Sequence, residues 1–288
     1  MGLTTPALPP LITRQRNAIL VALLALAALA WMMVVWQAGS DDHGAMGGSM
    51  DMGSMSAEDM GSTAMDMGSP ASSLDLTMGM GAGLYLAMWV AMMTAMMFPA
   101  AAPMILLFAR MERGKRDRGK PYVPTAVFTG SYLALWAAFG LLAFGLSAGL
   151  ERVAEDSTWI VDGWERIGAV VLIGAGLYQL SPLKDRCLTG CRTPLAFLMS
   201  AWRPGTRGAV RLGLRHGAYC LGCCWLLFVV LVTLGVMNVA AMLAVTLVVF
   251  AEKTMPGGEQ VARAVAVGLV VLGAVVLVSP GALPSAVV

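Results

Sequence analysis

The stretch MWVAMMTAMMFPAAAPM, residues 88–104, decides the fold of this chain. It lies inside an apolar run over residues 81–109, longer than the roughly 20 residues that a helix needs to cross a bilayer. Five of its methionines fall on two neighbouring rows with a spacing of four residues: Met88, Met92 and Met96 on one row, and Met93 and Met97 on the other. Since each helical residue advances by about 100°, these rows cover roughly half of the helix surface. The stretch predicts a membrane-spanning helix with one face lined by thioethers.

This methionine face has two interpretations. Thioether sulfur is a soft, neutral ligand that suits Cu(I), so a face turned into a helix bundle would offer stepping sites for a soft cation. Methionine is also a common filler of irregular gaps in apolar cores. The density of methionines favours the ligand interpretation. Pro99 and Pro103 should interrupt the helix near its inner end and free backbone carbonyls there.

The composition of the whole chain fits a membrane protein. Of its 288 residues, 58% are hydrophobic and 12% are charged, whereas a soluble domain is about a quarter charged. The net charge of +2 indicates no nucleic-acid partner. We therefore predict an all-α, polytopic transmembrane bundle of about seven helices in contact with the lipid bilayer. The expected helices span residues 18–38, 81–109, 123–150, 167–183, 211–237, 239–251 and 264–278, with the bundle proper over 81–280 and a tight hairpin at Met237 and Asn238.

Basic residues in the short loops predict how the chain crosses the membrane, because Lys and Arg accumulate on the cytoplasmic side. Residues 110–120 hold six basic and two acidic side chains, and residues 184–215 hold seven basic and one acidic. Residues 151–166 are acid-rich and carry two tryptophans, which suits the outer interface. This pattern predicts a cytoplasmic N-terminus and an outer C-terminus.

The first expected helix, residues 18–38, follows a tail over residues 1–17, which we place in the cytoplasm. It is either a membrane anchor or a cleaved signal peptide with Ala38 at the cleavage site. The length of the apolar run and the bulky tryptophans near that site favour the anchor. At the other terminus, we expect a short tail over residues 281–288.

Between the first two expected helices lies a segment of very different composition. Residues 39–80 are rich in Gly, Ser, Asp and Met, with nine methionines between residues 41 and 80. Such a segment buries too little apolar surface to offset the entropy lost on ordering, so we expect a flexible outer loop. Its histidine and methionines can gather around one Cu(I) without a preformed fold; a metal-free linker is the alternative. The candidate ligands include His43, Met46, Met50, Met52 and Met55.

The five cysteines form two clusters, one in CLTGC (residues 187–191) and one in HGAYCLGCC (residues 216–224). On a helix, the histidine and cysteines of the second cluster would lie along one stripe. Thiolates with an imidazole bind Cu(I) or Zn(II). The CxxC spacing also fits dithiol redox chemistry, and cysteine is often only a small buried residue. We favour metal ligands near the inner surface, with candidates at Cys187, Cys191, His216, Cys220, Cys223 and Cys224.

Four polar residues stand in or beside the expected spans. Gln179 and Asn238 lie in apolar surroundings and are expected to bond across helices. Glu252 and Lys253 fall at the inner end of the sixth span. An ionisable residue inside a membrane is a functional candidate, but an interface position with the lysine reaching to water fits equally well.

The motifs MWVAMMTAMMFPAAAPM, YQLSPLKDRCLTGCR, CLGCCW, GVMN and EK, in this order, resemble the bacterial family of predicted metal-binding integral membrane proteins. Some members of that family are labelled copper chaperones. The resemblance covers roughly residues 80–256 and implies a polytopic inner-membrane protein that handles metal. In an inner-membrane protein, the topology predicted from the basic residues places the loop over residues 39–80 in the periplasm. Carried over motif by motif, it points to Met88, Met92, Met93, Met96, Met97, Cys187, Cys191, Cys220, Cys223, Cys224, Met237, Asn238, Glu252 and Lys253.

Three functions fit these observations. The first is a Cu(I)-binding membrane protein that collects copper at the outer loop and supplies it for cuproenzyme assembly, with a cuproenzyme or periplasmic copper protein as partner. The second is a copper importer, and the third is a non-catalytic assembly subunit of a membrane complex. The chain has no GxxxxGK[ST] motif of an ATP-driven pump. With two histidines and no nucleophile–base pair, we expect no enzymatic activity.

Overall fold

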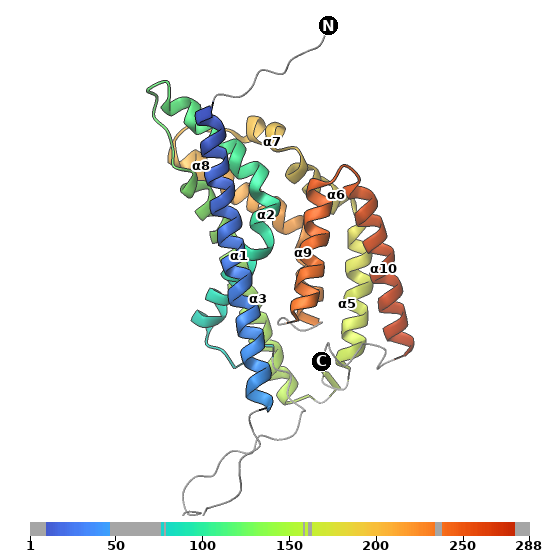
Figure 1. Ribbon diagram of the computed structural model, residues 1–288. Coiled ribbons are helices and arrows are strands. Elements are labelled where there is room, and N and C mark those ends of the chain that lie inside the picture. Colours follow the sequence, from blue (N-terminus) through green and yellow to red (C-terminus); the bar gives the residue numbers. More distant parts are fainter. Residues whose placement is uncertain are drawn as a thin grey trace, which may run out of the picture.

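The computed structural model describes residues 10–46, 76–77, 79–157, 159–160, 163–233 and 238–279, and it describes side chains within 10–46 only for residues 17–36. Residues 39–46, which we expected in the loop, are helical. The side chains of the expected ligands His43, Met46, Met50, Met52 and Met55 lie outside the described ones. In the described ranges the structure is all helical (Figure 1). The helices are α1 (Pro10–Met46), α2 (Ala82–Arg116), α3 (Thr125–Glu155), α5 (Trp164–Gln179), α6 (Pro182–Arg192), α7 (Pro194–Ala201), α8 (Gly205–Thr233), α9 (Val239–Thr254) and α10 (Gly258–Val278).

The all-helical prediction is confirmed, but the count of about seven helices is not, since the described residues form nine. The two additional helices, α6 and α7, lie largely in the basic segment over residues 184–215, which the sequence predicts to be a loop. Local signals start both of them. Ser181 caps α6 by accepting a hydrogen bond from the Lys184 backbone at 3.2 Å, and proline holds the first position of each helix.

Five of these helices are long and apolar enough to cross a membrane: α2, α3, α8, α10 and the segment Asn17–Trp36 of α1. The pair α5 and α6 forms a sixth candidate, bent by 61° at the break between them. The remaining expected span, α9, has 16 residues, fewer than the roughly 20 that a straight span requires. The expected break between α8 and α9 falls at residues 234–238, most of which lie outside the described ranges. The five candidate spans identify the chain as a membrane protein.

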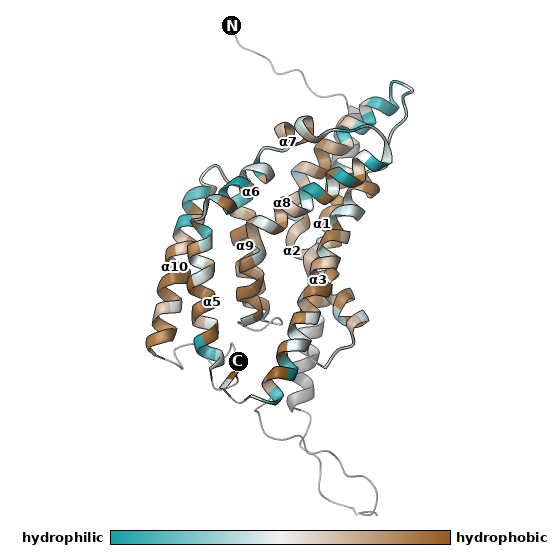
Figure 2. Ribbon diagram, turned by 180° about the vertical axis from the view of Figure 1, so that it is seen from behind, coloured by the Kyte–Doolittle hydropathy of each residue, from teal (hydrophilic) through white to brown (hydrophobic). Residues whose placement is uncertain are grey.

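Charge separates the two ends of the bundle. Residues 110–120 and 184–215 lie together at the upper end in Figure 1, which we call the basic end. The acid-rich end of α3 lies at the opposite end, which we call the acidic end. Figure 2 shows hydrophilic residues gathered near the ends and hydrophobic ones along the length of the helices. The predicted topology requires such a separation of basic and acidic residues between the two ends of the bundle.

Helix α2 supplies much of the core, and α1, α3 and α9 pack against it. Its methionine face is turned inward, because Met92, Met93, Met96 and Met97 are all 2% exposed or less. On the other side of the bundle, α5 and α10 pack closely through glycines. A Cβ atom on Gly176 would lie 2.7 Å from the backbone oxygen of Ala266, so only glycine permits this approach.

We predict that Gly176→Ala loosens the packing of α5 on α10 and destabilises the protein. Backbone atoms of α10 leave the new methyl group no room, and overpacking of this kind costs about 1–3 kcal/mol. Thermal unfolding in detergent measures the effect. Gly174→Ala is the matched control on the same helix, because a Cβ there meets nothing within 4 Å. Equal melting temperatures for the two variants would contradict the prediction.

Candidate metal site

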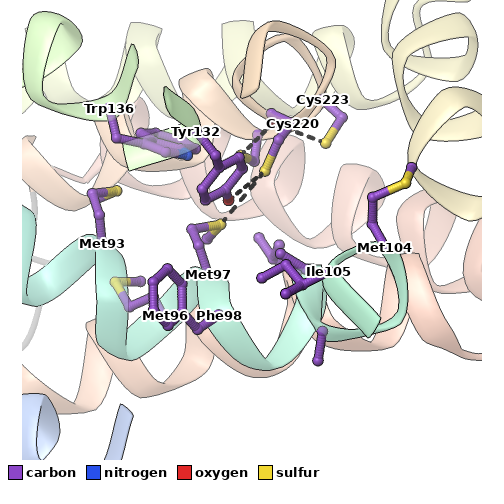
Figure 3. Packing of buried hydrophobic residues seen from close by; sticks show 14 of the residues in the cluster. Met93, Met96, Met97, Phe98, Met104, Ile105, Tyr132, Trp136, Cys220 and Cys223 are labelled. Carbon is purple, nitrogen blue, oxygen red and sulfur yellow. Dashed lines mark hydrogen bonds between the residues drawn. The ribbon is translucent and has the colours of Figure 1, made fainter. Parts of the chain in front are cut away.

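The methionine face of α2 meets the cysteine stripe of α8 in the interior of the bundle. The Met97 Sδ atom lies 4.0 Å from the Cys220 Sγ atom. Both side chains are almost completely buried, at 0% and 1% exposed. Figure 3 shows Met97 reaching from α2 toward Cys220. The structure therefore brings together two soft ligands that stand 123 residues apart in the chain.

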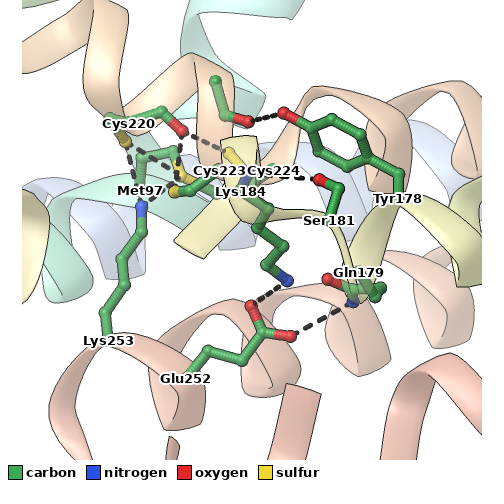
Figure 4. Close-up of polar contacts among 11 residues, drawn as sticks. Met97, Tyr178, Gln179, Ser181, Lys184, Cys220, Cys223, Cys224, Glu252 and Lys253 are labelled. Carbon is green, nitrogen blue, oxygen red and sulfur yellow. Dashed lines mark hydrogen bonds and ion pairs between the residues drawn. The ribbon is translucent and has the colours of Figure 1, made fainter. Parts of the chain in front are cut away.

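Two further helices contribute to this meeting point. The Tyr132 hydroxyl of α3 lies 3.2 Å from the Cys220 sulfur. The Lys253 ammonium of α9 lies 3.0 Å from the Cys220 sulfur and 4.0 Å from the Met97 sulfur (Figure 4). We call these four residues, Met97, Tyr132, Cys220 and Lys253, the Cys220 cluster. Four helices thus converge on one cysteine.

The other cysteines surround this cluster. The Cys223 and Cys224 thiols donate to the Cys220 carbonyl oxygen at 3.0 and 2.8 Å, as expected for neighbours along one helical stripe. Helix α6, which carries Cys187 and Cys191, packs against α8 at these cysteines. The structure therefore places the two cysteine clusters side by side.

Packing of α6 against α8 depends on a glycine. A Cβ on Gly222 would lie 2.7 Å from the Cys187 sulfur, so the absence of a side chain lets Cys187 approach. On the same turn, the Tyr178 hydroxyl donates to the Gly222 carbonyl oxygen. Cys187 and Cys191 are half-buried, whereas the three cysteines of α8 are buried.

His216 lies one turn before Cys220 on α8 and is 3% exposed. Neither of its ring nitrogens has a hydrogen-bond partner among the described residues. Its ring stacks on Phe128 and Tyr132, with ring centres 6.0 and 5.5 Å apart. A buried imidazole without a partner is costly, and it keeps a lone pair available for a metal ion.

A buried ion pair lies near the Cys220 cluster. The Lys184 ammonium of α6 bonds the Glu252 carboxylate of α9 at 2.7 Å, and the Gln179 amide donates to the same carboxylate at 3.1 Å (Figure 4). Lys184 and Glu252 are 1% and 2% exposed. The expected cross-helix bond of Gln179 is confirmed. Asn238 caps α9 by accepting from the Ala241 backbone at 2.9 Å.

The donor set decides which metal these residues suit. Among the described residues, no group of three or more His, Cys, Asp or Glu side chains converges to hold a metal ion. A site at the Cys220 cluster would combine the cysteine with the methionine sulfur that lies 4.0 Å from it. Thiolate and thioether together suit Cu(I), whereas zinc sites use cysteine, histidine and carboxylate.

The structure sorts the candidates that the sequence singled out. Cys220 joins Met97, and Cys187 and Cys191 join the α8 cysteines. The remaining candidates on α2, Met88, Met92, Met93 and Met96, are buried along the same helix. The sequence analysis did not single out two residues near the candidates: Tyr132, which contacts Cys220, and Lys184, which pairs with Glu252. Tyr132 carries no sequence signal, but Lys184 stands beside an apolar span and qualified as an ionisable candidate.

These features define a polytopic helical membrane protein whose buried interior is lined with sulfur. The family model described as PpoB2, copper chaperone, matches residues 86–276. The chain belongs to this family, which confirms the resemblance seen in the sequence and implies copper as its metal. None of the curated proteins and none of the solved structures matches the chain. The family match contains the α2 methionines and both cysteine clusters, and it begins after the methionine-rich segment.

We predict that breaking the buried ion pair destabilises the bundle strongly. Lys184→Met leaves the Glu252 carboxylate buried without a counter-charge, and removing one partner of such a pair costs about 3–5 kcal/mol. The double variant Lys184→Met/Glu252→Leu should recover most of this loss, because it leaves no uncompensated charge.

Thermal unfolding in detergent measures both variants. Asp117→Asn is the control, since it breaks the exposed Arg113–Asp117 contact of 3.6 Å and should cost no more than about 1 kcal/mol. A double variant less stable than Lys184→Met would show that the charge pair is not the source of the stability.

Proposed function

We propose that this protein binds Cu(I) inside the bundle and delivers it for the assembly of a cuproenzyme. The contact between the Met97 and Cys220 sulfurs carries this proposal. Two sulfurs each about 2.3 Å from one metal ion and about 120° apart lie about 4.0 Å from each other. The observed separation of 4.0 Å therefore suits a shared, three-coordinate ion without a large rearrangement.

The Lys253 ammonium supports the same conclusion. It lies within 4.0 Å of both sulfurs and holds a positive charge where the bundle excludes water. The surroundings of the two sulfurs therefore already stabilise one positive charge. We propose that Cu(I), which also carries one charge, takes the place of the ammonium charge, that Lys253 releases one proton to water as the ion binds, and that His216 supplies the third ligand.

The methionine face of α2 supports a path to this site. Helix α2 runs from the acidic end to the basic end of the bundle, so Met88 lies nearer the acidic end than Met97. Buried methionines recur between them at Met92, Met93 and Met96. We propose that copper enters from the periplasmic side, passes along these thioethers and reaches Cys220, after capture by the methionine-rich segment over residues 39–80.

The same row of methionines favours a second candidate, an importer of copper across the inner membrane. In that case the ion would pass from Cys220 to the half-buried Cys187 and Cys191 at the basic end. Uptake of copper into sealed vesicles that contain the purified protein separates the two functions. Net accumulation inside the vesicles supports import, whereas binding without accumulation supports delivery on one side.

We predict that Met97→Leu weakens Cu(I) binding while the fold is retained. Leucine keeps the apolar volume but removes one sulfur ligand, so affinity should fall by about tenfold or more, which corresponds to about 1.4 kcal/mol. Competition with a chromophoric Cu(I) chelator under reducing, anaerobic conditions measures the change. Met104→Leu is the matched control, since Met104 is also buried on α2 and stands seven residues after Met97, about two helical turns away. Wild-type affinity in Met97→Leu would remove Met97 from the site.

We predict that deletion of residues 41–69 lowers the amount of copper bound per chain without abolishing it. The deletion removes His43 and seven of the nine methionines of the methionine-rich segment and leaves the Cys220 cluster in place. Metal analysis of the detergent-purified protein, grown with copper, compares the two chains. Copper that is unchanged by the deletion would exclude capture by the segment. Copper absent from both chains would favour an assembly subunit without metal.

A further inference from the structure

The short helix α7 lies at the basic end of the bundle, beside the start of α8 (Figure 1). It buries Phe197 and Leu198 but leaves Leu195 and Met199 exposed, at 56% and 70%. Trp202 follows directly, and its ring packs against Phe108 at 5.8 Å. A short helix with an uncovered apolar side next to a tryptophan is typical of the boundary between lipid tails and headgroups.

A small cavity of about 90 Å³ opens between the end of α7 and the start of α8. Three arginines, Arg203, Arg211 and Arg215, line it together with Ser200 and Trp202, and no carboxylate lines it. The walls are therefore strongly basic and rich in hydrogen-bond donors. The space has room for a phosphate group but not for a whole lipid.

The arginines of this cavity lack a counter-charge. Arg211 and Arg215 stand four residues apart on α8, where like charges repel each other. Neither they nor Arg203 take part in the ion pairs found in the described part of the chain. Arg215 lies over the rings of Phe197 and Tyr219, at 5.6 and 5.8 Å, which fixes its guanidinium without neutralising it. An anion between the three guanidinium groups would remove the repulsion.

We propose that this cavity binds the phosphate headgroup of an anionic phospholipid from the leaflet at the basic end. The planar guanidinium groups of Arg203, Arg211 and Arg215 match a phosphate through paired hydrogen bonds. The acyl chains would cover the exposed apolar side of α7. Basic pockets between membrane helices are suited to such headgroups. The lipid would hold the start of α8, the helix that carries Cys220, and its binding does not depend on copper.

Native mass spectrometry of the purified protein tests the proposal. Phosphatidylglycerol and phosphatidylcholine with the same acyl chains serve as probes. We expect the wild-type chain to retain phosphatidylglycerol in preference to phosphatidylcholine. Arg211→Gln/Arg215→Gln should lower the retained phosphatidylglycerol by about tenfold. Arg118→Gln/Lys120→Gln is the matched control, because it removes the same charge at the same end, outside the cavity.

The outcomes separate the sources of the phosphate. Equal loss in the control pair would show that general surface charge is responsible and would overturn the proposal. Displacement of phosphatidylglycerol by millimolar inorganic phosphate would overturn it in favour of a soluble phosphate. If Arg211→Gln/Arg215→Gln fails to fold, the single variant Arg215→Gln tests the proposal. It should lower retention by about threefold, and unchanged retention would refute the site.

Discussion

The contact of the Lys253 ammonium with the Cys220 sulfur organises the centre of this protein. A charge inside a membrane bundle is expensive unless a partner compensates for it. The neighbouring Glu252 is engaged by Lys184, so the sulfur atoms of Cys220 and Met97 provide the surroundings of the Lys253 charge. Since these residues come from α9, α8 and α2, the contact fixes how the three helices meet. A centre that already holds a cation between two sulfurs is suited to a soft monovalent ion.

The break between α5 and α6 brings the remaining elements to this centre. A straight span would carry Gln179 and Lys184 along one line, but the bend of 61° directs both toward Glu252. The same bend lays α6 across α8, where Gly222 admits the Cys187 sulfur. The half-buried thiols of α6 thus lie beside the buried cysteines of α8. The ion pair and the thiols therefore depend on one irregularity of the backbone.

Local patterns predicted much of this arrangement. A spacing of four residues placed the α2 methionines on one face, and the same spacing placed His216 and Cys220 on one stripe. The helices α6 and α7, by contrast, were not predicted, because their segment was interpreted as a loop from its many basic residues. Ser181 and Pro182 are nevertheless a helix start signal for α6. Partners far apart in the chain were also missed. Tyr132 stands in an ordinary apolar run, and Cys220 and Lys253, which are 33 positions apart, share no pattern that pairs them. Such contacts arise from the packing of whole helices.

The extent of the family match separates two parts of the proposed copper path. Residues 86–276 contain every described sulfur of the Cys220 cluster, whereas the segment over residues 39–80 lies outside the match. The proposed site within the bundle therefore lies in the part of the chain that matches the family, and the proposed capture by the methionine-rich segment lies outside it. From its low apolar content, we expect the neutral thioethers of this segment to bind copper weakly, because binding must then order the chain. In the proposed path, weak capture followed by a buried cysteine would give the ion a gradient of affinity toward the bundle, and it would leave the ligands of the segment free to collect the next ion.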